Sequence, residues 1–319
     1  MVSVIIPVFN RQHTLERLFA SLRRVTYRPV EFIFVDNGST DASRMLCETF
    51  CKEFSEKPSS NGALHAVTLH CPTPGACAAR NAGLDFAHGT YCCFFDSDDE
   101  FSPDFLSSMR TSIGDADVCL TRTRTVTEEG GEHVRNGWPN PKVYEHLLAQ
   151  NVSTQSFIAR TDYVRAIGGW ADLPIWQDYE FGLRLLSGQY RLLRQGCTLD
   201  ARTPRLAWNP GIWHRIHLHA DSITGGSFWE RAERIGYAFR FVRHETLSLY
   251  DKRATTALNY RVAIVRGHMR AEGHHEEARL LSLGVRQTIC RLLEIYVACR
   301  GRGAWRMALT FMRCRLFQD

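Results

Sequence analysis

The first 115 residues alternate between short apolar runs and segments whose apolar positions recur at helical spacing. Such runs predict buried β-strands, and the helical spacing predicts amphipathic helices. This alternation is typical of a parallel sheet with right-handed crossovers. The predicted strands are Val2–Val8, Val30–Val35, Leu64–His70 and Tyr91–Phe95. The predicted helices contain Leu15, Leu18, Phe19 and Leu22, then Met45, Phe50 and Phe54, and finally a segment from about Gly75 to Ala87.

The pattern becomes less regular after this part of the chain, and it is almost entirely helical after Gly225. We therefore predict an α/β fold with an appended, mostly helical C-terminal region, divided as 1–115, 116–224 and 225–319. For the middle part we predict three strands and two helices. They are Val118–Arg122, Ser156–Ala159 and Tyr190–Leu193, with helices at Tyr163–Ile167 and Asp178–Leu186.

The composition indicates a cellular compartment and a class of binding partner. The chain has 44% hydrophobic and 23% charged residues, no apolar run long enough to span a bilayer, and no secretory leader after Met1. Its 11 cysteines include no Cys-x-x-Cys pair, which favours buried free thiols in a reducing cytoplasm. Residues 225–319 hold 17 Lys and Arg against 9 Asp and Glu, so this part is +8 and the remainder −3 of the net +5. A basic region of this kind indicates an anionic partner such as phospholipid, lipid diphosphate or nucleic acid.

Three carboxylates follow the fourth predicted strand directly, in the sequence Asp96-Ser97-Asp98-Asp99. Ligands bind at this edge of open α/β sheets. Crowded carboxylates repel one another unless a cation joins them, and Mg²⁺ or Mn²⁺ prefers oxygen ligands and often keeps phosphate as a further ligand. The segment therefore indicates a metal–diphosphate site. The alternative is a solvated acidic turn, with Pro103 beginning the next helix.

The ends of the first two strands offer a place for a nucleotide. Pro7, Phe9 and Asn10 follow one strand, and Asp36 opens the run Asp36-Asn37-Gly38-Ser39-Thr40-Asp41 after the other. The second run is also a normal turn and helix N-cap, which is compatible with Asp36 facing a ligand. No dinucleotide-binding glycine motif or P-loop is present, so side chains and metal would have to hold a diphosphate.

Three further side chains suggest chemistry, each with a structural alternative. Arg80 on the third helix could face phosphate or base, or form an ordinary ion pair. Asp178 in the first turn of its helix could act as a general base, or simply complement the helix dipole. Three histidines occur in His214–His219, but strand alternation puts His214 on the opposite face from the others, which disfavours a three-histidine zinc site. Among these histidines, His217 is the one predicted to bind metal or phosphate.

In this order, the segments Val4–Asn10, Val35–Asp41, Ala79–Gly83, Asp96–Asp99 and Gln177-Asp178 strongly resemble glycosyltransferase family 2, of the GT-A fold. The resemblance covers Val2 to Thr224 and implies a Rossmann-like mixed sheet flanked by helices. It places Pro7, Phe9, Asn10, Asp36 and Arg80 around the nucleotide base, Asp96 and Ser97 at the nucleotide, Asp98 at a divalent Mg²⁺ or Mn²⁺, and Asp178 as catalytic base. Phe9 stands where the family usually has Tyr, and Gln177 where it usually has Glu.

The resemblance implies an inverting glycosyltransferase that moves a sugar from a nucleotide-diphosphate donor, with UDP expected, to a hydroxyl of a glycan or lipid-linked acceptor. The alternatives are a sugar-nucleotide nucleotidyltransferase and a non-catalytic nucleotide-sugar binder. We expect a cytoplasmic protein that binds no nucleic acid. The C-terminal helices would either contact anionic membrane or form a helical cap or homodimer interface. The membrane hypothesis rests on Trp305, Arg306, Phe311, Arg313, Arg315 and Phe317.

Overall fold

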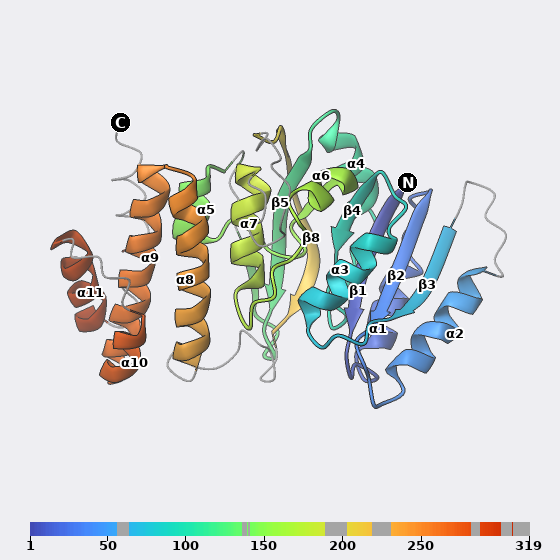
Figure 1. The fold of residues 1–319 in the computed structure, drawn as a ribbon. Helices are drawn as coiled ribbons and strands as arrows, with labels where there is room; N and C mark the ends of the chain where they lie inside the picture. Colours follow the sequence, from blue (N-terminus) through green and yellow to red (C-terminus); the bar gives the residue numbers. More distant parts are fainter. Residues whose placement is uncertain are drawn as a thin grey trace. The chain divides into compact units, whose positions relative to one another are not determined.

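The chain folds into two compact units in the computed structural model (Figure 1). The described residues are 1–55, 64–135, 139, 141–188, 203–218, 231–281, 288–300 and 308. The first unit comprises Met1–Asn140, Val152–Asp172 and Gly188–His219, and the second comprises Pro141–Asn151, Leu173–Ser187 and Ala220–Asp319. Two short segments before residue 188 thus group with the C-terminal helices. The predicted division at 115 and 224 stays a prediction.

The first unit is built on a mixed sheet that contains eight strands within the described residues. Its order is β3-β2-β1-β4-β7-β5-β6, and β8 pairs with β5. Strands β1 to β4 run parallel, β7 is antiparallel to both β4 and β5, β6 is antiparallel to β5, and β8 is parallel to β5. The strands are β1 (Val2–Val8), β2 (Val30–Asp36), β3 (Leu64–His70), β4 (Tyr91–Phe94), β5 (Val118–Val126), β6 (Glu132–Arg135), β7 (Phe157–Arg160) and β8 (Leu206–His217).

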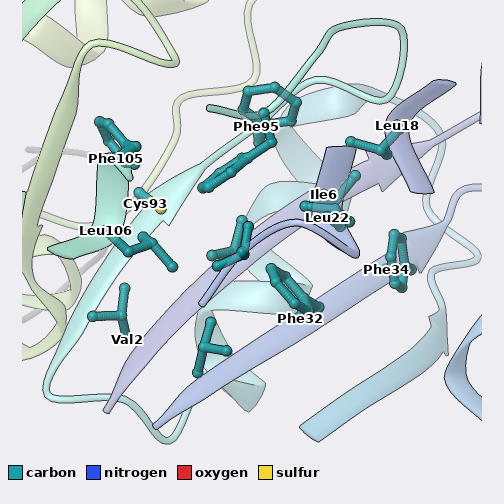
Figure 2. Packing of buried hydrophobic residues seen from close by; sticks show 14 of the residues in the cluster. Val2, Ile6, Leu18, Leu22, Phe32, Phe34, Cys93, Phe95, Phe105 and Leu106 are labelled. Atoms are coloured by element: carbon teal, nitrogen blue, oxygen red, sulfur yellow. The ribbon is translucent and has the colours of Figure 1, made fainter. Parts of the chain in front are cut away.

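Helices cover both faces of the parallel strands, which is why those strands are apolar almost throughout. The face of β1 that contains Val4 and Ile6 packs with β2, α1, α2 and α4 in one apolar cluster. Figure 2 shows Ile6 of β1 and Phe34 of β2 near Leu18 of α1. Stacked phenylalanines reinforce this layer, with Phe19 and Phe50 rings 4.3 Å apart. The helices of the first unit are α1 (Leu15–Leu22), α2 (Ser43–Ser55), α3 (Ala76–Phe86), α4 (Phe105–Ile113) and α6 (Thr161–Ala166).

Helix α3 covers the opposite face, and it lies unusually close to the strands because of one glycine. A Cβ added at Gly83 would stand 2.5 Å from Cγ2 of Ile5 and 3.1 Å from Cγ2 of Val35. Both methyl groups belong to the buried strands β1 and β2, so they have little room to move. The position of α3, which begins beside the functional edge of the sheet, therefore depends on the absence of a side chain at Gly83.

The structure confirms the predicted α/β class, with a mixed sheet and helical C-terminal region, and every predicted strand except one coincides with an observed strand. The exception, Tyr190–Leu193, lies outside the described residues. The sequence analysis predicted no strand at β6, no strand over the full length of β8, and no helix at α5 (Val143–Ala149). The pattern of β8 was obscured by Asn209-Pro210-Gly211 and by irregular register against β5, with shifts at Leu120/Arg122 and Thr123/Arg124.

The second unit is helical in its described part. Its core contains apolar side chains from each of its six described helices, among them Leu147, Leu183, Phe239, Leu258 and Val297. Arg184 and Glu180 form an ion pair whose side chains are both 0% exposed. None of the described helices is long and apolar enough to cross a membrane. The helices are α5 (Val143–Ala149), α7 (Gln177–Ser187), α8 (Ala232–Ser248), α9 (Lys252–Ala271), α10 (His275–Leu280) and α11 (Thr288–Arg300).

The cysteines within the described residues are free thiols, and all of them except Cys299 are buried. Burial raises the pKa of Cys92 and of Cys119 to about 12, so both stay protonated at neutral pH. These side chains therefore act as small apolar core residues, as the sequence predicted.

The close packing of α3 is testable with Gly83→Ala. In an ordinary helix this change stabilises by about 1 kcal/mol through helix propensity. Here overpacking against Ile5 and Val35 costs about 1–3 kcal/mol, so we expect a net loss of stability and a lower Tm. Thermal unfolding followed by circular dichroism measures the change. A rise in Tm would show that α3 can move away from the sheet freely.

Candidate functional site

The acidic turn after β4, which we define as Asp96 to Glu100, is held by a network of buried partners. Nη2 of Arg80 lies 2.8 Å from Oδ1 of Asp96. The amide of Gln155 donates to the other Asp96 oxygen at 3.2 Å and also to Oδ2 of Asp99. Arg80 and Gln155 are 6% and 3% exposed, so these bonds form in a largely dry environment. The turn is therefore positioned by α3 on one side and by the segment before β7 on the other.

Asp99 is the buried member of the turn. Its Oδ1 accepts a hydrogen bond from the backbone N–H of His217 at 2.7 Å. Burial, followed by the negative charges of Asp98 and Asp96, raises the pKa of the Asp99 carboxyl well above its usual range, although hydrogen bonds from Gln155 and His217 oppose this. Asp99 thus joins the acidic turn to the end of β8, which is a structural role.

Asp98 is the carboxylate of the turn that faces charged groups of the first loop, defined as Phe9 to Thr14. Its Oδ2 lies 3.4 Å from Nη2 of Arg11, and the two side chains are 17% and 36% exposed. Arg17 of α1 donates to the backbone carbonyl of the same residue. Asp98 therefore stands beside basic groups of the first loop and of α1, with part of its side chain exposed.

The acidic turn suits a divalent cation in the chemistry of its donors. Carboxylate oxygens are the preferred ligands of Mg²⁺ and Mn²⁺, and the negative charges of Asp98 and Asp96 add to burial in raising the pKa of Asp99. Within the described residues, no three His, Cys, Asp or Glu side chains converge as a complete metal cage. A metal here would need further ligands from a bound molecule, which a diphosphate can provide.

The first loop and the end of β2 are joined through polar contacts. Asn10 adopts a left-handed conformation with φ 50°, and its Oδ1 accepts a hydrogen bond from the backbone N–H of Thr40 at 2.9 Å. Its own N–H donates to Oγ of Ser39 at 3.1 Å. Asp36 is 2% exposed and accepts from the N–H of Ser39 at 3.3 Å. The turn expected after β2 is thus present, and Asn10 is a structural link as well as a predicted nucleotide contact.

The remaining predicted residues of this edge lie around the same loop. Pro7 pairs with Val35 between β1 and β2, and the Phe9 ring is 54% exposed. Ser97 is buried, and its carbonyl accepts a hydrogen bond from Oγ1 of Thr14 at 3.2 Å. The parallel pairing of β2, β1 and β4 therefore brings the predicted nucleotide-binding segments to one edge of the first unit.

Arg80 is positioned by aromatic stacking. Its guanidinium lies 4.7 Å from the ring centroid of Trp170. The side chain of Asn81 binds the Trp170 backbone on both sides, donating to its carbonyl at 2.9 Å and accepting from its N–H at 2.8 Å. Gly169 has φ 63°, and a Cβ there would stand 2.5 Å from Asn81 Oδ1. Arg80 therefore holds Asp96 in place, while its predicted contact with base or phosphate stays a prediction.

His214 and His217 have different surroundings. His214 is buried among Phe95, Phe101 and Phe105, and its Nδ1 accepts a hydrogen bond from the N–H of Ser102 at 3.1 Å. Nε2 of His217 lies 2.9 Å from Oε1 of Glu100. His219 lies outside the described residues. The role of His217 as a metal ligand stays a prediction, with Glu100 as its partner in the structure.

Asp178 belongs to the second unit, on the first turn of α7. The amide of Gln150 donates to its Oδ2 at 3.0 Å. Gln150 has φ 52° at the end of α5, and Trp176 has φ 57° just before α7. The carboxylate is thus oriented by a side chain at the end of a neighbouring helix, and the N-terminal end of α7 favours its ionised form. Its role as catalytic base stays a prediction.

The sequence analysis missed Arg11, Gln155 and Trp170. Arg11 directly follows the predicted Asn10, so its place in the loop was a usable signal. Gln155 becomes a neighbour of Asp96 because β7 is antiparallel to β4, with Tyr91 opposite Arg160 and Cys92 opposite Ala159. No local pattern predicts that register, and none predicts the stacking of Trp170 on Arg80.

A family model described as "Glycosyl transferase family 2" matches residues 3–163, slightly more than half of the chain. The chain belongs to glycosyltransferase family 2. The match begins in β1 and ends in α6, so it includes the acidic turn, the first loop and Arg80, but not Asp178.

Similar proteins agree with this assignment. Glycosyltransferase GlyA of Streptococcus pneumoniae serotype 4 is 32% identical over 152 residues, which are 46% of this chain but only 20% of GlyA. The crystal structure of S. aureus TarS 1-349 matches with a TM-score of 0.59 at 17% identity, covering 100% of this chain and 93% of that one. Mannosyltransferase PcManGT from Pyrobaculum calidifontis matches with a TM-score of 0.57 at 15% identity, covering 99% and 84%. At these identities the two structures show a shared fold, which confirms the predicted GT-A architecture.

The pocket of His214 predicts a specific acid sensitivity. Burial lowers the pKa of His214 to about 3, against about 6.5 in an unfolded chain, so only the unfolded state gains this proton between those values. The stabilisation by neutral His214 is complete above about pH 6.5 and is lost as pH falls toward 3, by up to about 1.4 kcal/mol per unit.

We therefore compare the wild type with His214→Asn, whose amide cannot titrate. The variant is less stable at pH 8 because it packs poorly against the phenylalanines, but the difference in unfolding free energy should narrow between pH 6 and 4. Urea unfolding at several pH values measures both proteins. A constant difference would show that His214 does not remain neutral in the fold.

Proposed function

We propose that the protein is an inverting glycosyltransferase that moves a sugar from a nucleotide-diphosphate donor to a hydroxyl acceptor. The observation that supports it most is the edge of the first unit where the acidic turn and the first loop meet through Arg11 and Asp98. This edge combines carboxylates, an exposed aromatic ring and basic side chains, which suit metal, base and phosphate respectively. Family membership supports the same class of reaction.

UDP is the proposed nucleotide. TarS has been crystallised with UDP and with UDP-GlcNAc, and PcManGT with GDP-Man and Mn²⁺. Those ligands belong to those proteins, but both fold relatives bind a nucleoside diphosphate linked to a sugar. In this chain Pro7, Phe9, Asn10, Asp36 and Arg80 would surround the base, and Asp96 and Ser97 would contact the rest of the nucleotide.

Asp98 is the residue proposed to bind Mg²⁺ or Mn²⁺, with His217 as a second protein ligand. A divalent cation bound there would supply neutralising charge for the diphosphate leaving group. The protein's own contribution is to hold the turn in place, because Arg80 and Gln155 fix Asp96 and the His217 N–H fixes Asp99. This leaves the partly exposed Asp98 side chain on a turn that is held by buried partners.

Asp178 is proposed to accept the proton of the acceptor hydroxyl as its oxygen attacks the anomeric carbon. Attack from the face opposite the leaving group inverts the anomeric configuration in one displacement, so no carboxylate nucleophile is needed. The hydrogen bond from Gln150 orients one oxygen of this carboxylate. Gln177, in place of the usual Glu, donates to the carbonyl of Leu173 at 2.8 Å and so helps to close the turn before α7.

The acceptor is proposed to be a glycan or a lipid-linked sugar in polysaccharide biosynthesis, at the cytoplasmic side of a membrane. The basic C-terminal part supports contact with anionic lipid, and a homodimer through the same helices is the competing role. The aromatic and arginine residues that suggested the membrane contact lie outside the described residues.

A donor panel tests the proposed reaction. The protein is incubated with Mn²⁺ and UDP-, GDP- or dTDP-sugars, and the released products are measured by chromatography. Slow release of UDP from at least one UDP-sugar, lost in Asp98→Ala, is the expected result. Release of pyrophosphate from UTP and a sugar phosphate would favour a nucleotidyltransferase, and binding without any product would favour a non-catalytic binder.

Asp178→Asn separates the base from donor binding. Removal of a general base lowers the rate of transfer by about 100- to 10,000-fold, while UDP affinity should change by less than about twofold. Glu276→Gln, at an exposed position of α10, provides a control with the same loss of one charge. Calorimetry gives the affinity and UDP release gives the rate. Full activity in Asp178→Asn would remove this residue from the proposed mechanism.

A further inference from the structure

Arg11 links the first loop to the acidic turn through its side chain. Its Nη2 lies 3.4 Å from Oδ2 of Asp98, and its Nη1 lies 3.5 Å from the carbonyl of Phe9 and 3.4 Å from that of Asn10. The guanidinium therefore bridges the ends of β1 and β4, at the carboxylate that is proposed to bind metal. The family motif considered above gives this arginine no role, and the proposed function counts it only among the basic side chains of this edge.

The backbone of Arg11 is anchored by a hydrogen bond, whereas its guanidinium group is partly exposed. The N–H of Arg11 donates to Oγ of Ser43 at 2.7 Å, which anchors this residue to the start of α2. Its side chain is 36% exposed, and the 3.4 Å separation from Asp98 is longer than a short charge-assisted hydrogen bond. An ion pair of this exposure is weak and easily exchanged.

Two other carboxylates of the turn, those of Asp96 and Asp99, are paired differently. Asp96 is bound by Arg80, whose side chain is 7% exposed and stacks on Trp170. Asp99 is bound by buried Gln155 and by a backbone N–H. These partners are held by packing, so they cannot leave when a cation arrives. The pair between Asp98 and Arg11 is the exchangeable one among these contacts.

We propose that Arg11 is a built-in counter-ion that competes with divalent metal for Asp98 and so disfavours binding of metal alone. This inference rests on the proposed function and concerns the regulation of the same site. A free cation must displace the guanidinium and gains few protein ligands in return, since no three described metal-binding side chains converge. A cation that arrives with a nucleoside diphosphate has the phosphate oxygens as additional ligands. Arg11 thereby favours occupancy of the site by the metal–nucleotide pair.

The test measures binding of Mn²⁺ alone to the full chain, from the loss of the free-ion signal in electron paramagnetic resonance. Arg11→Gln removes the competitor and should tighten Mn²⁺ binding about two- to fivefold, within the range expected for a partly exposed ion pair. Arg11→Lys keeps a competing charge and should stay within about twofold of the wild type. Asp98→Ala should remove the Mn²⁺ site in every background.

Arg17→Gln is the matched control, because Arg17 is also close to Asp98 but donates to its backbone carbonyl rather than to its carboxylate. Loss of this charge should change Mn²⁺ affinity by less than about twofold. An equal effect of both glutamine variants would reduce the role of Arg11 to general charge. Unchanged or weaker Mn²⁺ binding in Arg11→Gln, including none detected, would overturn the inference.

Binding of UDP in the presence of Mn²⁺, measured by calorimetry on the same proteins, separates this inference from the proposed function. If the wild type binds Mn²⁺ and UDP together but Arg11→Gln does not tighten Mn²⁺ alone, only the role of Arg11 fails. If the wild type binds no nucleotide with metal, or Asp98→Ala binds both as well as the wild type does, the proposed metal-dependent function fails.

Discussion

Electrostatic repulsion among the carboxylates of the acidic turn is the constraint on which the functional edge depends. Acidic groups crowded at the end of a buried strand cannot remain together unless each is given a partner. The fold supplies a stacked arginine for Asp96, a buried amide and a backbone N–H for Asp99, and an exposed arginine for Asp98. These partners come from α3, from the segment before β7, from β8 and from the first loop, so the charge cluster organises much of the first unit.

The partners of these carboxylates also differ in how firmly packing holds them. The Arg80 guanidinium stacks on Trp170. The backbone of Trp170 is in turn held by two hydrogen bonds to the side chain of Asn81. The buried side of the turn is therefore rigid. Arg11 lies on the solvent side, where its charge can be exchanged for that of a cation. A rigid support with one exchangeable charge is suited to binding a charged ligand without rearrangement of the sheet.

The proposed base is supported separately, in the helical unit. Asp178 begins a helix in which buried Arg184 pairs with Glu180 of the same helix and also lies 4.0 Å from Oε1 of Glu245 on α8, and Gln150 orients the Asp178 carboxylate. Breaking a buried ion pair of this kind leaves an uncompensated charge, so α7 has a strong reason to keep its position within its unit. The residues proposed to bind the donor thus belong to the first unit, and the proposed base belongs to the second.

The sequence by itself determined the parallel strands, the helices between them, the family, and the residues at the strand ends. These features are local, because burial makes strands apolar at period two or throughout, and because parallel pairing brings strand ends to one edge. Only the tertiary structure decided which group each carboxylate meets. Gln155 reaches Asp96 through an antiparallel register, and Trp170 reaches Arg80 through a glycine loop at Gly169. Contacts between residues far apart in the chain depend on register and close packing, which leave no periodic trace in the order of amino acids.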